Sequence, residues 1–249
     1  NEMCSHDEKD TTSLDEKIPD FTKNINSSIE GLKIGLVKEF DLSKLDTDVV
    51  KVFEESKKHY ESLGAKFVEI SLPNISLSVP TYYVVAPAEC SSNLSRFDGV
   101  KFGKRCENPK DLEELYIQTR SEGFGDEVKR RILIGSYVLS AGFYDAYFSK
   151  ACKVRRLIKN SYDLLFEEND ALFIPTTTSV AHDIDRKNSS PVEAYLADIF
   201  TVTANLCGIP ALNIPAGFSK KENLPFGLQI LSNSFKEETL FSLAHLLKE

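Results

Sequence analysis

Apolar and polar residues are arranged between residues 32 and 72 in a way that predicts a β-α-β unit. Leu32–Val37 and Lys66–Leu72 each have the composition and spacing of a strand. Between them, apolar residues recur at helical spacing after Asp46 or Thr47, either of which suits the N-cap, and Gly64 suits the position after the helix. The buried face expected for this helix comprises Val49, Val52, Phe53, Ser56, Tyr60 and Leu63. Such a unit favours an α/β sheet.

The pattern becomes mainly helical from about Leu77 to Glu168, which predicts a helical insertion over residues 77–168. Its clearest helix runs from Tyr144 to Phe166. The apolar face expected there comprises Tyr147, Ala151, Val154, Ile158 and Leu165. A basic stripe on the other side comprises Lys150, Lys153, Arg156 and Lys159. We expect this stripe to be a solvated face, although it is also the local charge most suited to RNA.

Strand patterns return in the last third of the chain. The expected elements are a strand at Ala171–Pro175, a helix from Ser190 to Cys207 that ends at Gly208, strands at Ala211–Pro215 and Gly227–Leu231, and a helix at Lys236–Leu247. The predicted fold class is therefore α/β, with a mixed sheet flanked by helices and a helical insertion. Residues 1–30 are polar and acidic and are interpreted as a connector to a domain at 31–249.

Composition limits the possible functions. The 249 residues are 41% hydrophobic and 27% charged, as in an ordinary globular protein. A formal net charge of −8 argues against binding nucleic acid through bulk charge. No apolar run approaches the roughly 18 residues that a membrane span needs. Five scattered cysteines without a C-x-x-C pair, and four dispersed histidines, favour a reduced cytoplasmic chain without a metal site.

The sequence contains no self-contained catalytic motif for phosphate binding, dinucleotide binding or zinc hydrolysis. Ser91 and Ser92 form a possible nucleophile pair, but no glycine turn exposes them, and we expect them on a helix surface. Cys207 precedes Gly208 at a helix end and is expected to be a small buried residue. Pairing of Cys207 with His182 stays an open alternative without support.

Three residues could together bind a zwitterion. Arg131 borders the apolar face of a helix, where a guanidinium pairs with an internal acid or binds a carboxylate ligand. Asp198 lies on the helix expected to begin at Ser190, and Tyr82 offers a phenol at the start of an apolar run. An arginine for a carboxylate and an aspartate for an ammonium would suit an amino acid, but a structural role for each residue is the simpler interpretation.

Several segments in order along the chain resemble the amidase signature family. These segments are Tyr82–Gly99, Ser121–Gly125, Glu127–Ile132, Gly142–Tyr147, Lys153–Arg155, Asn205–Pro210 and Pro225–Gln229. Within that family, they are most similar to the glutaminase A subunits of the amidotransferases that convert misacylated Glu-tRNA(Gln) or Asp-tRNA(Asn). The resemblance extends over nearly the whole chain from about Gly31 and implies the amidase-signature fold.

The resemblance also implies which part of the enzyme is present. The catalytic Lys, cis-Ser and nucleophilic Ser of the family lie in or near a Gly/Ser-rich signature, and no such stretch occurs here. The polar segment His6–Ser13 resembles the connector that follows the signature. We therefore expect a C-terminal portion that has no catalytic residue and is inactive alone.

In the A subunits, a Tyr, an Arg and an Asp hold glutamine, and the resemblance carries these roles to Tyr82, Arg131 and Asp198. Phe102 stands where the family more often has Tyr, which leaves a hydroxyl contact in doubt. The implied chemistry is attack of a serine on the glutamine amide and release of ammonia into a channel. The implied partners are a B subunit that uses ATP and Mg²⁺ on the misacylated tRNA and a C subunit that binds both; no cofactor is expected in this chain.

Two other interpretations remain at this point. A general amidase of the same family would act on some other amide, but a simple amide offers neither a carboxylate for Arg131 nor an ammonium for Asp198. A non-enzymatic module that docks partner subunits is the other alternative, and whether the chain is soluble and folds cooperatively alone would distinguish it.

Overall fold

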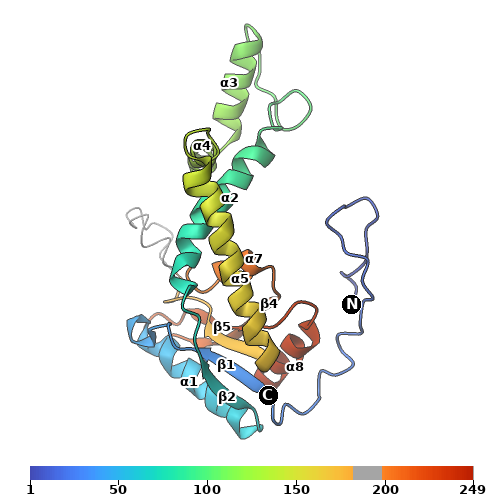
Figure 1. The fold of residues 1–249 in the computed structure, drawn as a ribbon, viewed down its shortest axis with the longest axis vertical. Coiled ribbons are helices and arrows are strands. Elements are labelled where there is room, and N and C mark those ends of the chain that lie inside the picture. Colours follow the sequence, from blue (N-terminus) through green and yellow to red (C-terminus); the bar gives the residue numbers. More distant parts are fainter. Residues whose placement is uncertain (182–197, 249) are drawn as a thin grey trace. The chain divides into compact units, whose positions relative to one another are not determined.

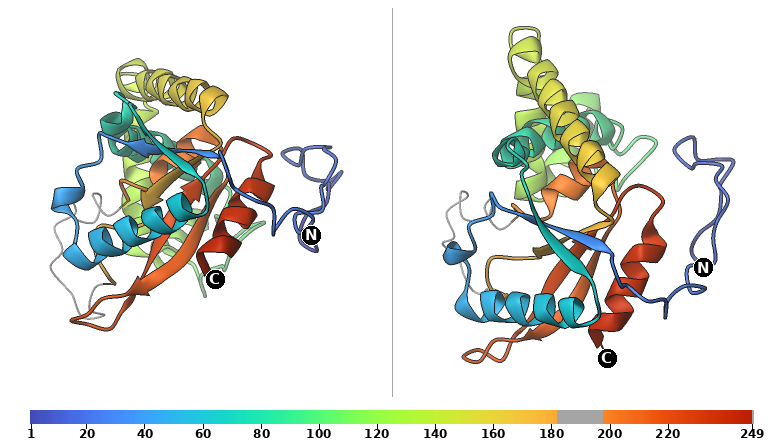
Figure 2. Two further views of the ribbon diagram at one scale, coloured as in Figure 1. Left: turned by 90° about the horizontal axis from the view of Figure 1, so that it is seen from below. Right: turned by 60° about the horizontal axis from the view of Figure 1, so that its bottom comes forward.

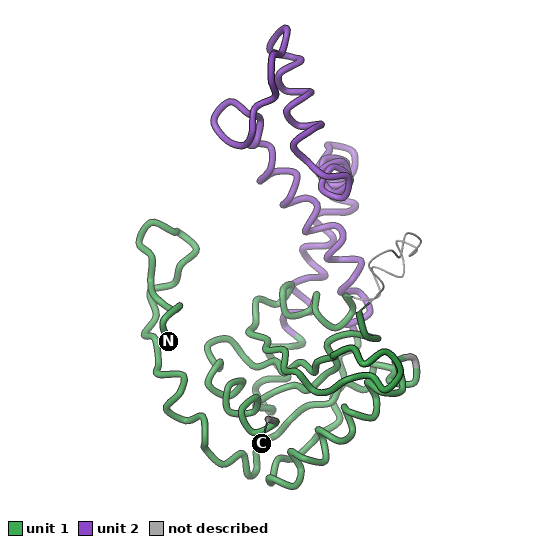
Figure 3. The backbone as a smooth tube through the Cα atoms, turned by 180° about the vertical axis from the view of Figure 1, so that it is seen from behind, with its two compact units in different colours: residues 1–73, 161–249 green, residues 74–160 purple. Residues whose placement is uncertain are grey.

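The computed structural model describes residues 1–181 and 198–248, which form two compact units. Unit 1 comprises Asn1–Pro73 and Ser161–Glu249, and unit 2 comprises Asn74–Asn160 (Figure 3). Each unit is described separately below.

Unit 1 contains a five-stranded mixed sheet with the strand order β2-β1-β3-β5-β4 (Figure 1). The strands are β1 (Lys33–Val37), β2 (Lys66–Ile70), β3 (Ala171–Pro175), β4 (Ala211–Phe218) and β5 (Pro225–Leu231). β1 pairs in parallel with β2 and β3, whereas β5 is antiparallel to both β3 and β4. The predicted β-α-β unit and mixed α/β sheet are confirmed.

Helices α1 (Thr47–Ser62) and α8 (Glu237–Lys248) pack on one face of this sheet, and α7 (Val202–Cys207) lies on the other (Figure 2). The core beneath α1 and α8 is aromatic: the rings of Phe53 and Phe173 stack at 4.9 Å. Tyr60 meets Phe173 edge-on at 5.6 Å and donates a hydrogen bond of 2.8 Å to the carbonyl oxygen of Leu243. The sheet and both helices are thereby joined in a single core.

The ends of α1 follow the sequence signals closely. Of the two candidate N-caps the structure uses Asp46, whose Oδ1 accepts a hydrogen bond of 2.8 Å from the backbone N–H of Asp48. Gly64 adopts a φ of +93°, which favours glycine. Leu63 does not join the buried face as predicted. It follows the last helical residue, where the chain turns at Gly64, and its side chain is 37% exposed.

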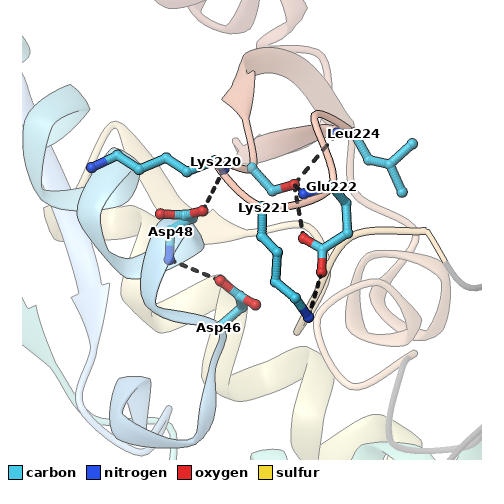
Figure 4. Close-up of polar contacts among 7 residues, drawn as sticks. Asp46, Asp48, Lys220, Lys221, Glu222 and Leu224 are labelled. Atoms are coloured by element: carbon cyan, nitrogen blue, oxygen red, sulfur yellow. Dashed lines mark hydrogen bonds and ion pairs between the residues drawn. The ribbon is translucent and has the colours of Figure 1, made fainter.

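The loop between β4 and β5 is tied to the start of α1 (Figure 4). Oδ2 of Asp48 accepts a hydrogen bond of 2.6 Å from the backbone N–H of Lys220. Within the loop, the buried hydroxyl of Ser219 accepts from the backbone N–H groups of Glu222 and Leu224. These bonds satisfy backbone N–H groups of the loop that form no hydrogen bond within the sheet.

Residues 1–30 contain no helix or strand, and most of their side chains are exposed. The end of this segment nevertheless packs against the rest of unit 1. Phe21 meets Phe241 edge-on at 5.8 Å, the hydroxyl of Ser242 donates to the carbonyl oxygen of Asn24, and Ile29 is buried in the core. The packed part of the unit therefore begins before Gly31.

Unit 2 is helical in its described elements. It contains α2 (Ser78–Leu94), α3 (Leu112–Gly123), α4 (Asp126–Val138), the π-helix η3 (Tyr144–Ser149) and the first part of α5 (Lys150–Glu168). Two short 3-10 helices complete the described elements of the chain, η1 (Leu42–Lys44) in unit 1 and η2 (Ile75–Leu77) in unit 2. None of the described helices combines the length and hydropathy needed to cross a bilayer.

The predicted helix from Tyr144 begins as a π-helix and becomes an α-helix at Lys150, and this changes which of its residues are buried. Ala151, Ile158 and Leu165 are buried as expected, but Tyr147 is 44% exposed. A π-helical turn holds more residues than an α-helical turn. Residues before Lys150 are therefore rotated away from the apolar face that α5 buries.

Candidate functional site

Tyr82 and Arg131 come together within unit 2, where α2 packs against α4. Nη1 of Arg131 donates a hydrogen bond of 3.2 Å to the hydroxyl of Tyr82. Gly135 lies one helical turn after Arg131 and therefore on the same face of α4. A Cβ at Gly135 would lie only 2.0 Å from the carbonyl oxygen of Pro87 in α2. The missing side chain thus permits the close helix contact that brings the two residues within hydrogen-bond distance.

Glu127 holds the guanidinium of Arg131 from a second side. Its Oε1 accepts a bond of 3.1 Å from Nε of Arg131, and its Oε2 accepts from Nη1 of Arg130 at 2.5 Å. The hydrogen bond to Tyr82 raises the pKa of Arg131; partial burial opposes this shift and the contact with Glu127 adds to it. The guanidinium is therefore a fixed cation. The sequence reasoning missed Glu127, although its spacing of four residues before Arg131 is a known helix pairing.

The Arg131 guanidinium does not use all of its donors on the residues that the structure describes. An arginine side chain carries five N–H donors in a planar fork, and the described contacts use Nε and one bond of Nη1. In the part of the chain that the structure describes, Nη2 of Arg131 has no hydrogen-bond partner. The side chain is 31% exposed, so the guanidinium is not fully covered and keeps donors that suit a carboxylate ligand.

Asp198 belongs to unit 1 and lies in a turn, not inside a helix as predicted. Its carbonyl oxygen accepts hydrogen bonds from the backbone N–H groups of Thr201 at 3.0 Å and Val202 at 3.1 Å. Helix α7 begins only at Val202, and the expected start at Ser190 lies outside the described residues. The predicted end is confirmed, because Gly208 follows Cys207 with a φ of +62°. Grouping of Asp198 with Tyr82 and Arg131 stays a prediction.

The other candidates are placed as follows. Ser92 is exposed on α2 as expected, but Ser91 is buried and donates to the carbonyl oxygen of Ala88 at 3.0 Å, so its predicted surface position was wrong. Ser91 faces α4, since its hydroxyl lies 2.6 Å from where a Cβ at Gly135 would be. Cys207 is buried as predicted, whereas His182 lies outside the described residues.

Two surface features remain without an assigned ligand. Phe102 is exposed and lies under the guanidinium of Arg96 at 5.1 Å, and whether its missing hydroxyl matters stays a prediction. The basic stripe lies on α5 and comprises Lys150, Lys153, Arg156 and Lys159, and a role of the stripe in RNA binding stays a prediction. The described residues include no group of three or more His, Cys, Asp or Glu side chains suited to a metal ion.

Comparisons with known proteins place the chain in a family. The A subunit of glutamyl-tRNA(Gln) amidotransferase from Hahella chejuensis is 56% identical over 245 residues, and that from Nitrosococcus oceani is 54% identical. Each match covers 98% of this chain and 50% of the relative, so the chain spans about half the length of the curated relatives it matches.

Solved structures of related proteins have a similar fold. The crystal structure of the glutamyl-tRNA(Gln) amidotransferase A subunit from Thermotoga maritima superposes with a TM-score of 0.72 and 37% identity, over 96% of this chain and 46% of that one. A bacterial aryl acylamidase of the amidase signature family has the same TM-score at 16% identity, over 97% of this chain and 48% of its own, which supports the fold alone. The Amidase family matches residues 1–241. This chain therefore belongs to the amidase family and has the amidase-signature fold.

Proposed function

We propose that this chain is the glutamine-binding, C-terminal portion of the glutaminase A subunit of a tRNA-dependent amidotransferase. Relatives that share more than half of its residues carry the name of that subunit, and the chain spans about half of their length. The observation that carries the proposal is the guanidinium of Arg131, which is held by Tyr82 and Glu127 and whose Nη2 has no partner among the described residues. A fixed cation with unused donors suits the α-carboxylate of an amino acid.

Glutamine is a zwitterion, and the proposed ligand residues match both of its charges. Arg131 binds the α-carboxylate through two parallel hydrogen bonds, and Tyr82 keeps the guanidinium in the plane that this requires. Asp198 accepts hydrogen bonds from the α-ammonium. A general amidase that acts on a simple amide would gain nothing from either charge, which favours the glutaminase over that alternative.

The remaining parts of the reaction are assigned to other parts of the enzyme. The serine that attacks the glutamine amide, with its Lys and cis-Ser partners, belongs to the signature region, and the packed part of this chain forms the C-terminal part of the amidase domain. Ammonia then reaches a B subunit, which uses ATP and Mg²⁺ to amidate misacylated Glu-tRNA(Gln) or Asp-tRNA(Asn), while a C subunit binds both. The complex works in the cytoplasm, and this chain alone hydrolyses no glutamine.

Steady-state glutamine hydrolysis by the assembled complex tests the proposal with a matched pair of variants. Arg131→Met removes this guanidinium and should raise KM for glutamine by about tenfold to a hundredfold, as expected for loss of a charged hydrogen bond. Arg130→Met removes the neighbouring guanidinium, which bonds to the same Glu127, and should leave KM nearly unchanged. Equal KM values for the two variants would exclude Arg131 as the carboxylate site.

A further inference from the structure

We infer that Gln229 is a positioning residue, which holds the turn carrying Asp198 in place and thereby sets the affinity for the α-ammonium of glutamine. This inference rests on the proposed function, because it concerns the same substrate. It adds a residue that makes no contact with glutamine and acts only through Asp198.

Gln229 is a buried polar side chain on an interior strand of the sheet. It lies on β5, between β3 and β4, and is 6% exposed. Its neighbours Leu228 and Ile230 belong to the core beneath α1 and α8. Because side chains alternate along a strand, Gln229 points to the opposite face, where α7 lies. A primary amide is costly to bury on that face unless it has a partner.

The partner of Gln229 is the turn that carries Asp198. Nε2 of Gln229 donates a hydrogen bond of 2.9 Å to the carbonyl oxygen of Phe200. Phe200 is itself buried, and its ring meets Phe40 edge-on with the ring centres 4.8 Å apart. The side chain and the carbonyl group of Phe200 are therefore both held, two residues after Asp198.

The other end of the turn is held by its own backbone. The carbonyl oxygen of Asp198 accepts from Thr201 and Val202, which joins Asp198 to the start of α7. The path from Asp198 to Val202 is thus fixed at Asp198 by α7 and at Phe200 by Gln229. Among the described residues, Gln229 is the one donor to the carbonyl of Phe200, so its loss would leave that carbonyl without this partner and let the turn move.

The test uses the assembled complex with Gln229→Met and, as a control, Leu231→Met. Methionine is close to glutamine in size but cannot donate a hydrogen bond. Leu231 is a suitable control because it is buried on the same strand and face as Gln229 and makes no side-chain hydrogen bond. We expect Gln229→Met to raise KM for glutamine by about tenfold, as for loss of one buried hydrogen bond, with little change in kcat. Leu231→Met should leave KM near the wild-type value.

Two further measurements separate positioning of Asp198 from a general loss of structure. The first is the inhibition constant of 4-carbamoylbutyrate, which has the carboxylate and amide of glutamine but no ammonium; Gln229→Met should leave it unchanged. The second combines Gln229→Met with Asp198→Asn, and the double variant should have the KM of Asp198→Asn alone. Weaker inhibition, or an additive rise in KM, would overturn the inference.

The outcomes also distinguish this inference from the proposed function. If Asp198→Asn raises KM for glutamine but Gln229→Met does not, Asp198 binds glutamine and Gln229 has no positioning role. If Asp198→Asn leaves KM unchanged, the assignment of the ammonium site is wrong, and the inference falls with it.

Discussion

The hydroxyl of Tyr82 accepts a hydrogen bond of 3.2 Å from Nη1 of Arg131, across the contact between α2 and α4. The geometry depends on Gly135, one turn further along α4, since any Cβ there would overlap the carbonyl of Pro87. The chemistry of the proposed site is therefore linked to the packing of the two helices that carry it.

Replacement of Gly135 should damage both stability and binding. Gly135→Ala places a Cβ 2.0 Å from the Pro87 carbonyl oxygen and 2.6 Å from the Ser91 hydroxyl, so α2 and α4 must separate. We expect a loss of about 1–3 kcal/mol in the free energy of unfolding, and a higher KM for glutamine. Gly123→Ala is the control, because its Cβ would meet nothing within 4 Å. A stable Gly135→Ala protein would contradict the packing described.

Loss of the Tyr82 hydroxyl should weaken glutamine binding without removing it. In Tyr82→Phe, the Arg131 guanidinium keeps its bond to Glu127 but loses the acceptor that fixes Nη1. We expect KM for glutamine to rise by about threefold to tenfold, as for loss of one hydrogen bond. Tyr116→Phe, on the exposed side of α3, serves as the control. Equal KM values for the two variants would show that Tyr82 does not orient Arg131.

Buried tyrosines should make the protein sensitive to alkali. Burial raises the pKa of Tyr60 and of Tyr162, so both stay protonated in the folded state when unfolded tyrosine, with a pKa of about 10, begins to ionise. Their contribution to stability is thus complete below about pH 10 and is lost as the pH rises further. The free energy of unfolding should fall by an additional ~1.4 kcal/mol per pH unit for each tyrosine.

Urea titrations between pH 7 and 11 would measure this decline. Tyr60→Phe removes one of the two ionisations and should make the fall less steep above pH 10. At neutral pH the same variant should cost about 1–2 kcal/mol, because the buried hydrogen bond from the Tyr60 hydroxyl to the Leu243 carbonyl is lost. A slope above pH 10 that does not change in Tyr60→Phe would contradict this assignment.

Most of the sheet could be predicted from sequence because its strands are short, apolar and bounded by clear turn residues. β1 and β3 are examples. The N-cap of α1 at Asp46 could likewise be predicted. The errors occur where local pattern does not decide the backbone. Tyr147 leaves its expected face because a π-helix precedes α5. Asp198 lies in a turn and not in the expected helix, since α7 begins only at Val202.

The site was only partly accessible to sequence reasoning. Charge chemistry could propose that Arg131 and Asp198 suit a zwitterion, but family resemblance was needed to select them. Glu127 and Gly135 were missed because their roles depend on which face of α4 meets α2. Gln229 lies in a strand pattern, where a single polar residue does not reveal that it bonds to the carbonyl of Phe200.

The central claim is that Arg131 serves glutamine recognition and nothing else in the reaction. The most direct test compares amidation of misacylated tRNA by the assembled complex with either glutamine or ammonium chloride as the nitrogen source. In Arg131→Met, amidation at low glutamine concentration should fall by about tenfold or more, while amidation with ammonium chloride stays at the wild-type rate. Equal losses with both nitrogen sources, or no loss with glutamine, would contradict the account.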